Sequence, residues 1–306
     1  MQRLRIWGWA AICFSLLTPL YCYGRSQWQR PAQTPQIQQL FAGITYQRQV
    51  YTSPRPYIVH IAKIDLTHPG IRVIATPGQP ADDDNEFRAQ PTSAFLTQFR
   101  LQLAMNAGYF YHFNEKTPWD YAPHTGGRVN VLGQSISMGQ PYSPPQKQWP
   151  VLCFDQSQRG RIVATGHCPS DTLHAVAGNY ILHPDQPLQL DSDKPYARSI
   201  AALDQTGTTL WLIVVDGKQP DYSEGATFAD IEQLIKQIGA DIALNLDGGG
   251  STTLVTSTRS GAKLLNAPIH GKWPMNERPV ATHLGIYASP IGEMADAQFN
   301  SLQNAP

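Results

Sequence analysis

Two aspartates stand where carboxylate chemistry could be built. Asp216 directly follows an apolar run at residues 208–215, and Asp247 directly follows another at residues 242–246. A pair of carboxylates flanking a glycosidic bond can cleave it, one acting as an acid and the other as a nucleophile or charge stabiliser. We therefore take Asp216 and Asp247 as candidate catalytic residues.

The second aspartate opens a glycine-rich segment, in which Gly248, Gly249 and Gly250 are followed by Ser251. Successive glycines allow backbone N–H groups to turn toward one ligand and form an anion-binding nest, to which the serine adds a hydroxyl. A tight turn beside a surface aspartate is the alternative for either Asp-Gly pair alone. Two such pairs, one of them with the glycine triplet, favour a site that holds a phosphodiester beside carboxylates.

The elements around the two aspartates predict that both lie at one edge of a sheet. Residues 208–215 are apolar and β-branched, as a strand covered on both faces requires. Thr227 and Asp230 fit a capping box for a helix that stops at Gly239, and residues 242–246 form a second strand. A strand–helix–strand unit is normally a right-handed crossover with both strands ending at the same edge. If the strands are neighbours, about 4.8 Å apart, the carboxylates are roughly 5–7 Å apart, and an intervening strand roughly doubles that distance.

The wider pattern predicts one large domain. Of the 306 residues 42% are hydrophobic, which allows a large core. We predict an α/β (mixed α+β) fold for residues 40–290, with a central mixed sheet that carries the site on its βαβ crossover. Residues 111–150 carry many Pro, Gly and Tyr residues without a clear period, and they are predicted to form a long loop over the site.

The ends of the chain predict export. A basic start, an apolar run to about Leu20 and the small residue Gly24 are typical of a signal peptide at residues 1–24, with a retained N-terminal anchor as the alternative. Residues 25–39 are predicted to be a flexible spacer, and residues 291–306 a tail. Loss of the signal removes two arginines and leaves 21 basic and 23 acidic residues. This balance attracts no nucleic acid, and no stable membrane insertion is expected after the signal is removed.

Cysteine usage agrees with export. Cys153 and Cys168 are separated by 15 positions and flank two predicted strands of a hairpin. In an oxidising compartment, periplasmic or extracellular, they should form a disulfide, with two buried thiols as the alternative. No C-x-x-C or paired histidine spacing accompanies them, so a metal site at these cysteines is not predicted.

Several short blocks together resemble the phosphodiester glycosidase family. The most specific block is NLDGGGS at residues 245–251, and the order and spacing of all blocks span residues 43–288. The other blocks are MNAGYF at 105–110, ARS at 197–199, VDGK at 215–218, Ser223 with Gly225, and NERPV at 276–280. Lys218 stands where the family commonly has arginine, so a bidentate grip on phosphate is lost there.

The resemblance implies a mixed α/β fold and hydrolysis of the bond between a sugar's anomeric carbon and a phosphodiester oxygen. It makes Asp247 the nucleophile or the stabiliser of an oxocarbenium ion, with Asp216 or Glu277 as its acid/base partner. Arg198 and Arg278 are the predicted ligands of the phosphate, because a guanidinium matches phosphate oxygens in fork geometry.

Further residues of these blocks are predicted to bind the substrate. The amide of Asn106 would hold a sugar hydroxyl, Asn245 would order Asp247, and Tyr109 with Phe110 would stack on a sugar face. The complete predicted substrate-binding set is Asn106, Arg198, Lys218, Ser223, Asn245, Gly248, Gly249, Gly250, Ser251 and Arg278.

The predicted function is that of an exported hydrolase that cleaves a sugar-1-phosphodiester, of an N-acetylhexosamine type, in cell-envelope or extracellular polysaccharide. No cofactor is predicted, and a calcium or magnesium ion at Asp216 and Asp247 stays an alternative. Two other functions stay open. One is a non-catalytic carbohydrate-binding or exopolysaccharide-assembly protein, and the other is a metal-dependent phosphodiesterase that cuts on the phosphorus side.

Overall fold

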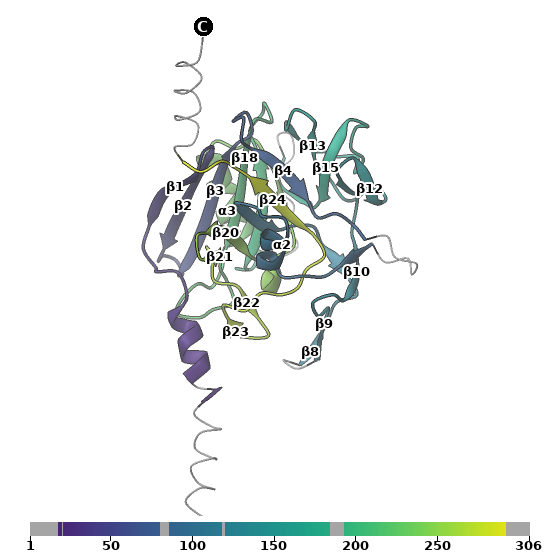
Figure 1. The fold of residues 1–306 in the computed structure, drawn as a ribbon. Helices are drawn as coiled ribbons and strands as arrows, with labels where there is room; N and C mark the ends of the chain where they lie inside the picture. The colour runs from purple at the N-terminus through teal and green to yellow at the C-terminus, as the bar shows by residue number, and fades with distance from the viewer. Residues whose placement is uncertain (1–17, 20, 80–85, 118–119, 184–192, 292–306) are drawn as a thin grey trace, which may run out of the picture.

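A computed structural model describes residues 18–19, 21–79, 86–117, 120–183 and 193–291 (Figure 1). Its largest sheet has seven strands in the order β1-β2-β3-β18-β17-β19-β16, and each neighbouring pair is antiparallel. The strands are β1 (Gln36–Phe41), β2 (Ile44–Tyr51), β3 (Tyr57–Asp65), β18 (Thr209–Val215), β17 (Arg198–Leu203), β19 (Ile242–Asn245) and β16 (Asn179–Leu182).

Two five-stranded antiparallel sheets accompany it. One has the order β21-β20-β6-β24-β4, with β21 (Gly261–Leu264), β20 (Leu254–Thr258), β6 (Leu103–Asn106), β24 (His283–Tyr287) and β4 (Arg72–Ala75). The other has the order β12-β11-β15-β13-β14, with β12 (Gln140–Ser143), β11 (Ser135–Ser137), β15 (Thr172–Ala177), β13 (Val151–Asp155) and β14 (Gly160–Val163).

Smaller sheets and short helices complete the described part. The small strands are β5 (Phe87–Arg88), β10 (Arg128–Val131), β7 (Phe110–Tyr111), β8 (Asn114–Thr117), β9 (Asp120–Ala122), β22 (Ile269–His270) and β23 (Trp273–Pro274). The helices are α2 (Thr92–Gln98), α3 (Phe228–Gln237) and the 3-10 turn η1 (Gly249–Ser251), and residues 21–28 are helical as well.

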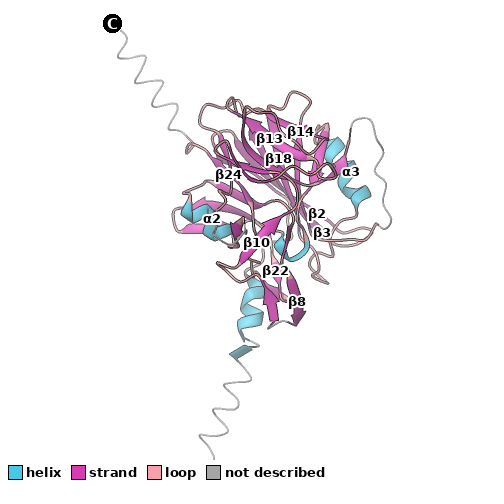
Figure 2. Cartoon of the chain, turned by 90° about the vertical axis from the view of Figure 1, so that its right-hand side faces the viewer, coloured by secondary structure: helices cyan, strands magenta, loops and turns pink. Residues whose placement is uncertain are grey.

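The layers are helix, sheet, sheet, helix. One face of the seven-stranded sheet packs on α3, and its other face packs on side chains of both five-stranded sheets. Helix α2 covers the outer face of the sheet that contains β6 and β24. Figure 2 shows α2 and α3 on opposite sides of the stacked strands. The fold is therefore mixed α/β in content but mostly strand.

Strand β18 shows how the sequence specifies this arrangement. Leu210, Leu212 and Val214 belong to the core between the sheets, while Trp211 and Ile213 belong to the core under α3. Side chains alternate between the two faces of a strand, so a continuous apolar run places apolar groups in both cores. The prediction of a doubly covered strand is confirmed by the burial of its residues 210–215.

The predicted crossover is only partly right. Helix α3 begins with the predicted capping box of Thr227 and Asp230, and it connects β18 to β19. However, β17 lies between β18 and β19 and pairs antiparallel with both. The two strands run in the same direction but are not neighbours, and the central sheet is antiparallel where described, not mixed. Two strand spacings separate their ends by roughly 10 Å.

Two predicted irregular segments contain regular structure. The predicted loop at 111–150 contains strands from β7 to β12, so that prediction is wrong. The predicted spacer at 25–39 is partly wrong, because its last residues belong to β1 and Arg48 Nε donates to the carbonyl of Thr34 at 2.8 Å. The predicted signal at 1–24 and tail at 291–306 lie largely outside the described residues and stay predictions.

The predicted disulfide is present. Cys153 and Cys168 are bonded, with their Cα atoms 5.9 Å apart, and β13 and β14 form the predicted hairpin. Both cysteines are buried in a small apolar cluster. Such a bond fits an exported protein. Among the described residues, no helix combines the length and apolar character that crossing a membrane requires.

Candidate active site

A pocket of about 350 Å³ opens where β17 begins and β19 ends. Asp247 lies in its wall, and no other carboxylate lines it among the described residues. Aromatic rings and two arginines make up most of the remaining wall. The lining residues are Tyr109, Phe110, Phe113, Tyr196, Ala197, Arg198, Phe228, Asn245, Asp247, Gly248 and Arg278.

Asp247 has the electrostatics of an acid/base or nucleophilic group. Burial raises the pKa of its carboxyl from an ordinary 3.8 to about 6, against the opposing effects of the Ser251 hydroxyl, Arg278, the Gly248 N–H group and Lys218. The carboxyl therefore ionises close to neutral pH, in a pocket where its charge is poorly solvated. Perturbed pKa values of this kind gather at functional sites.

Asn106 positions Asp247 and does not reach the pocket. Its Nδ2 donates to the Asp247 carbonyl at 2.6 Å, and its Oδ1 accepts from Ser199 Oγ at 2.7 Å and from the Thr253 N–H group at 3.0 Å. The side chain is fully buried. The side chain does not line the pocket, and both its Oδ1 and one Nδ2 hydrogen bond the protein interior, so the predicted contact with a sugar hydroxyl is not supported.

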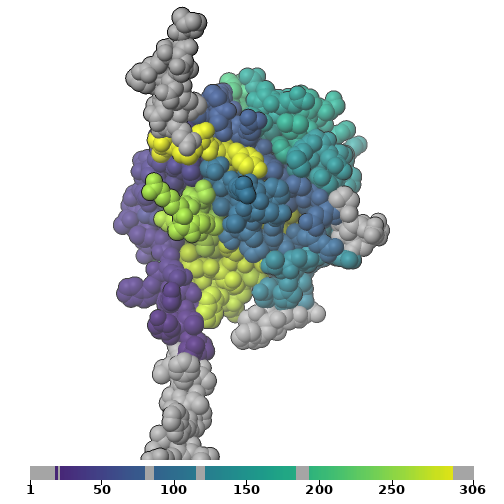
Figure 3. Space-filling model, in the orientation of Figure 1, coloured from purple at the N-terminus to yellow at the C-terminus, as the bar shows by residue number. Residues whose placement is uncertain are grey.

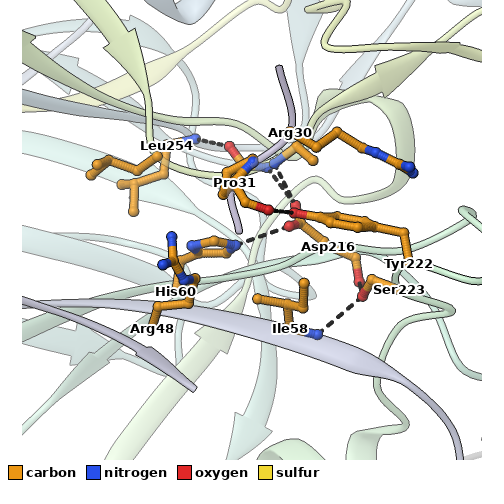
Figure 4. A network of polar contacts seen from close by, with 12 residues as sticks. Arg30, Pro31, Arg48, Ile58, His60, Asp216, Tyr222, Ser223 and Leu254 are labelled. Carbon is orange, nitrogen blue, oxygen red and sulfur yellow. Dashed lines mark hydrogen bonds and ion pairs between the residues drawn. The ribbon is translucent and has the colours of Figure 1, made fainter. Parts of the chain in front are cut away.

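Asp216 does not share the pocket. Its carboxylate is buried in a separate polar network, where Oδ2 bonds His60 Nε2 at 2.9 Å and Oδ1 accepts from Asn266 Nδ2 at 3.1 Å and from the Ala267 N–H group at 2.8 Å (Figure 4). His60 continues to Tyr46, whose hydroxyl lies 2.8 Å from His60 Nδ1. The predicted pairing of Asp216 with Asp247 is wrong. Strand β17 lies between β18 and β19, and the Asp216 carboxylate bonds His60 on β3 and residues 266–267 instead.

Two other predicted site residues are also structural. Glu277 accepts a hydrogen bond of 2.9 Å from the Ser93 N–H group and so satisfies the first turn of α2, and burial raises its pKa. Ser223 is fully buried, donates to the Asp216 carbonyl at 2.6 Å and accepts from the Ile58 N–H group. Neither residue lines the pocket, so the acid/base role for Glu277 and the substrate contact for Ser223 are not supported.

Both predicted arginines line the pocket. Arg198 donates from Nε to the Ala226 carbonyl at 3.0 Å, and its guanidinium lies 3.5 Å from the centre of the Phe228 ring. Burial lowers its pKa. Arg278 donates from Nη1 to Ser251 Oγ at 3.3 Å and lies 4.5 Å over the Phe113 ring. Two oriented guanidiniums beside Asp247 can hold an anionic group.

The glycine triplet brings backbone segments close together. A Cβ atom on Gly248 would lie 2.6 Å from the Ala197 carbonyl oxygen, and one on Gly250 would lie 2.6 Å from Arg278 Nη2. Gly249 has φ +63°. Its N–H group donates to the Ala197 carbonyl at 2.8 Å, and the Ser251 N–H group donates to the Gly248 carbonyl at 3.2 Å, so these two groups do not contribute to the predicted anion-binding nest. The glycines instead allow Asp247, Arg278 and residue 197 to approach one another.

The pocket also offers polar and apolar contacts for a sugar. Asn245 Nδ2 donates to the Tyr109 hydroxyl, while its buried Oδ1 has no hydrogen-bond partner within the described residues. Tyr196, Phe113 and Phe228 line the pocket in addition to the predicted Tyr109 and Phe110. Sequence reasoning missed Tyr196, although it directly precedes the block at 197–199.

Lys218 faces a second, adjoining cavity of about 450 Å³. Its Nζ lies 4.7 Å over the Tyr196 ring, at the boundary of the two cavities. Of the predicted residues, the structure thus gathers Asp247, Arg198, Arg278, Asn245 and Gly248 around one pocket. Lys218 and Gly250 line the second cavity, and buried Ser251 lines neither cavity but bonds Arg278. The described residues contain no group of three His, Cys, Asp or Glu side chains that could hold a metal ion.

Three solved structures are similar to this chain in fold. One is the catalytic domain of zebrafish N-acetylglucosamine-1-phosphodiester alpha-N-acetylglucosaminidase, auto-inhibited by its pro-peptide. The alignment covers 86% of this chain and 92% of that domain, with 19% identity and a TM-score of 0.58. A protein of Burkholderia pseudomallei K96243 assigned as exported gives 13% identity, coverage of 84% and 97%, and a TM-score of 0.62. A hypothetical protein from Synechocystis gives 16% identity and a TM-score of 0.59.

At these identities the similarity shows the fold alone. The alignment with the Synechocystis protein covers 84% of this chain but only 64% of that protein. No curated protein sequence matches the chain. The family model of the phosphodiester glycosidases, however, matches residues 99–287, which include the Asp247 pocket and most of the core. The chain belongs to the phosphodiester glycosidase family, as its sequence blocks indicate.

Proposed function

We propose that this chain is an exported hydrolase that cleaves a sugar-1-phosphodiester at the sugar side, with an N-acetylhexosamine-type sugar, in cell-envelope or extracellular polysaccharide. Membership of the family implies a glycosidase that acts on phosphodiester-linked sugars. The observation that carries the proposal is the position of Asp247, whose carboxyl has a raised pKa in a pocket with two arginines.

The chemistry needs one carboxylate in this pocket. Ionised Asp247 faces the anomeric carbon as nucleophile or as counter-charge to an oxocarbenium ion. The bond between that carbon and the phosphodiester oxygen breaks, and its electron pair stays on the oxygen. A phosphomonoester leaves readily without full protonation, so no second carboxylate has to act as general acid. Water then supplies the hydroxyl of the free sugar.

The arginines and aromatic rings support the two halves of the substrate. Arg278 and Arg198 stabilise the negative charge that grows on the departing phosphate, as preorganised cations do in other active sites. The sugar ring packs on the aromatic wall, and the unpartnered Oδ1 of Asn245 accepts from a sugar hydroxyl. A sugar can bury its apolar face on the rings and also give Asn245 Oδ1 a hydrogen-bond partner. A purely apolar ligand would leave that buried oxygen unsatisfied, so the pocket favours a sugar.

The test is hydrolysis of an N-acetylglucosaminyl phosphodiester by the purified chain. Free sugar and a phosphomonoester are the expected products, and Asp247→Asn should abolish their release. Glu277→Gln is the matched control, because it changes a carboxylate outside the pocket and keeps an oxygen for the Ser93 N–H group. Release of sugar phosphate instead would indicate a phosphodiesterase, and tight binding without turnover would indicate a binding protein.

A further inference from the structure

The second cavity adjoins the Asp247 pocket directly. Both are lined by Arg278, and Gly250 lines the second cavity while Gly248 lines the first. The glycine segment and this arginine therefore form a wall that the two cavities share. A ligand whose phosphate lies at Arg278 can extend to both sides, with its sugar beside Asp247 and its other half in the second cavity.

The second cavity is strongly cationic. Arg30, Lys218, Lys272 and Arg278 line it, and among the described residues no aspartate or glutamate does. The complete chain carries equal numbers of acidic and basic residues, so this gathering does not follow from composition. Clefts lined by charges of one sign concentrate ligands of the opposite sign.

Aromatic rings hold three of these cations. The Arg30 guanidinium lies 4.3 Å over the Tyr222 ring, Lys218 Nζ lies 4.7 Å over Tyr196, and the Arg278 guanidinium lies over Phe113. A ring orients a cation but does not neutralise it as a carboxylate would. The ring contacts therefore leave these side chains positively charged.

The backbone of both lysines is unusual. Lys218 has φ +58° and Lys272 has φ +62°, in the left-handed region that residues with a side chain rarely adopt. Such conformations persist where the surroundings fix them, and they gather at ligand sites. Gln27, beyond the predicted signal, lines the cavity on one side, and Trp273 Nε1 donates to the neighbouring Ser26 Oγ at 3.1 Å. Figure 3 shows this N-terminal segment against the late part of the chain.

We propose that the second cavity binds the aglycone side of the substrate and selects an aglycone that carries a further phosphate. The substrate class is then an oligomer or polymer with repeated glycosyl phosphodiesters, not a sugar phosphate linked to a neutral glycan. This inference rests on the function proposed above. It adds that recognition depends on a second anionic group beyond the bond that is cleaved.

The test compares three N-acetylglucosaminyl phosphodiesters that differ only in the aglycone. Its alkyl chain ends in a hydroxyl, a carboxylate or a phosphate, and kcat/KM is measured for the full chain at low and high salt. We expect the phosphate-ended substrate to be favoured over the neutral one by about tenfold at low salt, with the carboxylate in between, and the preference to shrink as salt screens the charges.

Variants locate the preference. Lys272→Gln should reduce the preference for the phosphate-ended substrate by about two- to fivefold, because each exposed charge contributes modestly. Lys263→Gln, an exposed lysine on β21 outside both cavities, is the matched control. Equal kcat/KM for the three substrates, or a preference that survives both Lys272→Gln and Arg30→Gln, would overturn the inference.

Binding separates this inference from the proposed function. The dissociation constants of the three compounds are measured with the inactive Asp247→Asn variant. Tighter binding of the phosphate-ended compound without turnover by the unaltered chain would support the cavity and refute the hydrolase. Turnover of all three compounds with equal binding would support the hydrolase and refute the anionic subsite.

Discussion

Replacing Asp247 with asparagine should make the folded chain more stable at neutral pH while it removes activity. Burial raises the carboxyl pKa from 3.8 to about 6, so the folded state binds this proton more tightly than the unfolded state. Each pKa unit corresponds to about 1.4 kcal/mol, so ionised Asp247 lowers the free energy of unfolding by up to about 3 kcal/mol above pH 6. Asparagine is neutral and keeps an oxygen acceptor at the same place.

The sign of the effect depends on pH. Below pH 3.8 the carboxyl is protonated in both states, and the variant and the unaltered chain should differ little. Between pH 3.8 and about 6 the unfolded state ionises first, and the stability of the unaltered chain falls relative to the variant. Above that window the difference should be constant at its largest value.

Urea unfolding at pH 4, 5, 6, 7 and 8 measures this difference, since the other titrating groups are common to both proteins. Asp221→Asn controls for the loss of one negative charge at an exposed position, and asparagine tolerates the left-handed backbone found there (φ +65°). A difference that stays flat from pH 4 to pH 8, or a variant that is less stable at pH 8, would refute the raised pKa.

Four further outcomes follow from the same structure. The value of kcat/KM should rise with pH through about pH 6 as Asp247 ionises, and a falling limb in that window would contradict its role. Asp216→Ala should lower the free energy of unfolding by about 3–5 kcal/mol, because buried His60 Nε2, Asn266 Nδ2 and the Ala267 N–H group lose this acceptor; a loss below about 1 kcal/mol in urea would show that the network is dispensable. Reduction of the disulfide should lower the free energy of unfolding by about 3 kcal/mol and so lower the melting temperature, while the chain stays folded, which calorimetry can check. Gly250→Ala should raise KM, since the new Cβ atom would displace the Arg278 guanidinium, while the chain still folds. An unchanged KM would show that this arginine does not bind substrate.

Local signals predicted the elements well. The apolar run of β18, the capping box of α3 and the cysteine hairpin depend on neighbouring residues, and each is present. The prediction that Asp247 belongs to the site rested on a block of seven consecutive residues, and Asp247 lines the pocket. In these cases the physical cause and the pattern lie within the same short segment of chain.

Long-range pairing explains the errors. Strand β17 precedes β18 along the chain, and no local pattern shows that it inserts between β18 and β19. That insertion moves Asp216 away from Asp247 and leaves it to bond His60 and Asn266, which are distant in sequence. The partners of Glu277 and Asn106, Ser93 and Ser199, also come from other parts of the chain, so no local pattern shows that the two side chains lie outside the pocket.

The bond from Asn106 to the Asp247 carbonyl joins two different layers. Asn106 ends β6 of a five-stranded sheet, whereas Asp247 follows β19 of the seven-stranded sheet. Asp247 is thus held between the two layers, and a displacement of one layer relative to the other would move its carboxylate. Substitutions in the interlayer core, far from any ligand, should therefore reduce turnover before they measurably loosen the molecule.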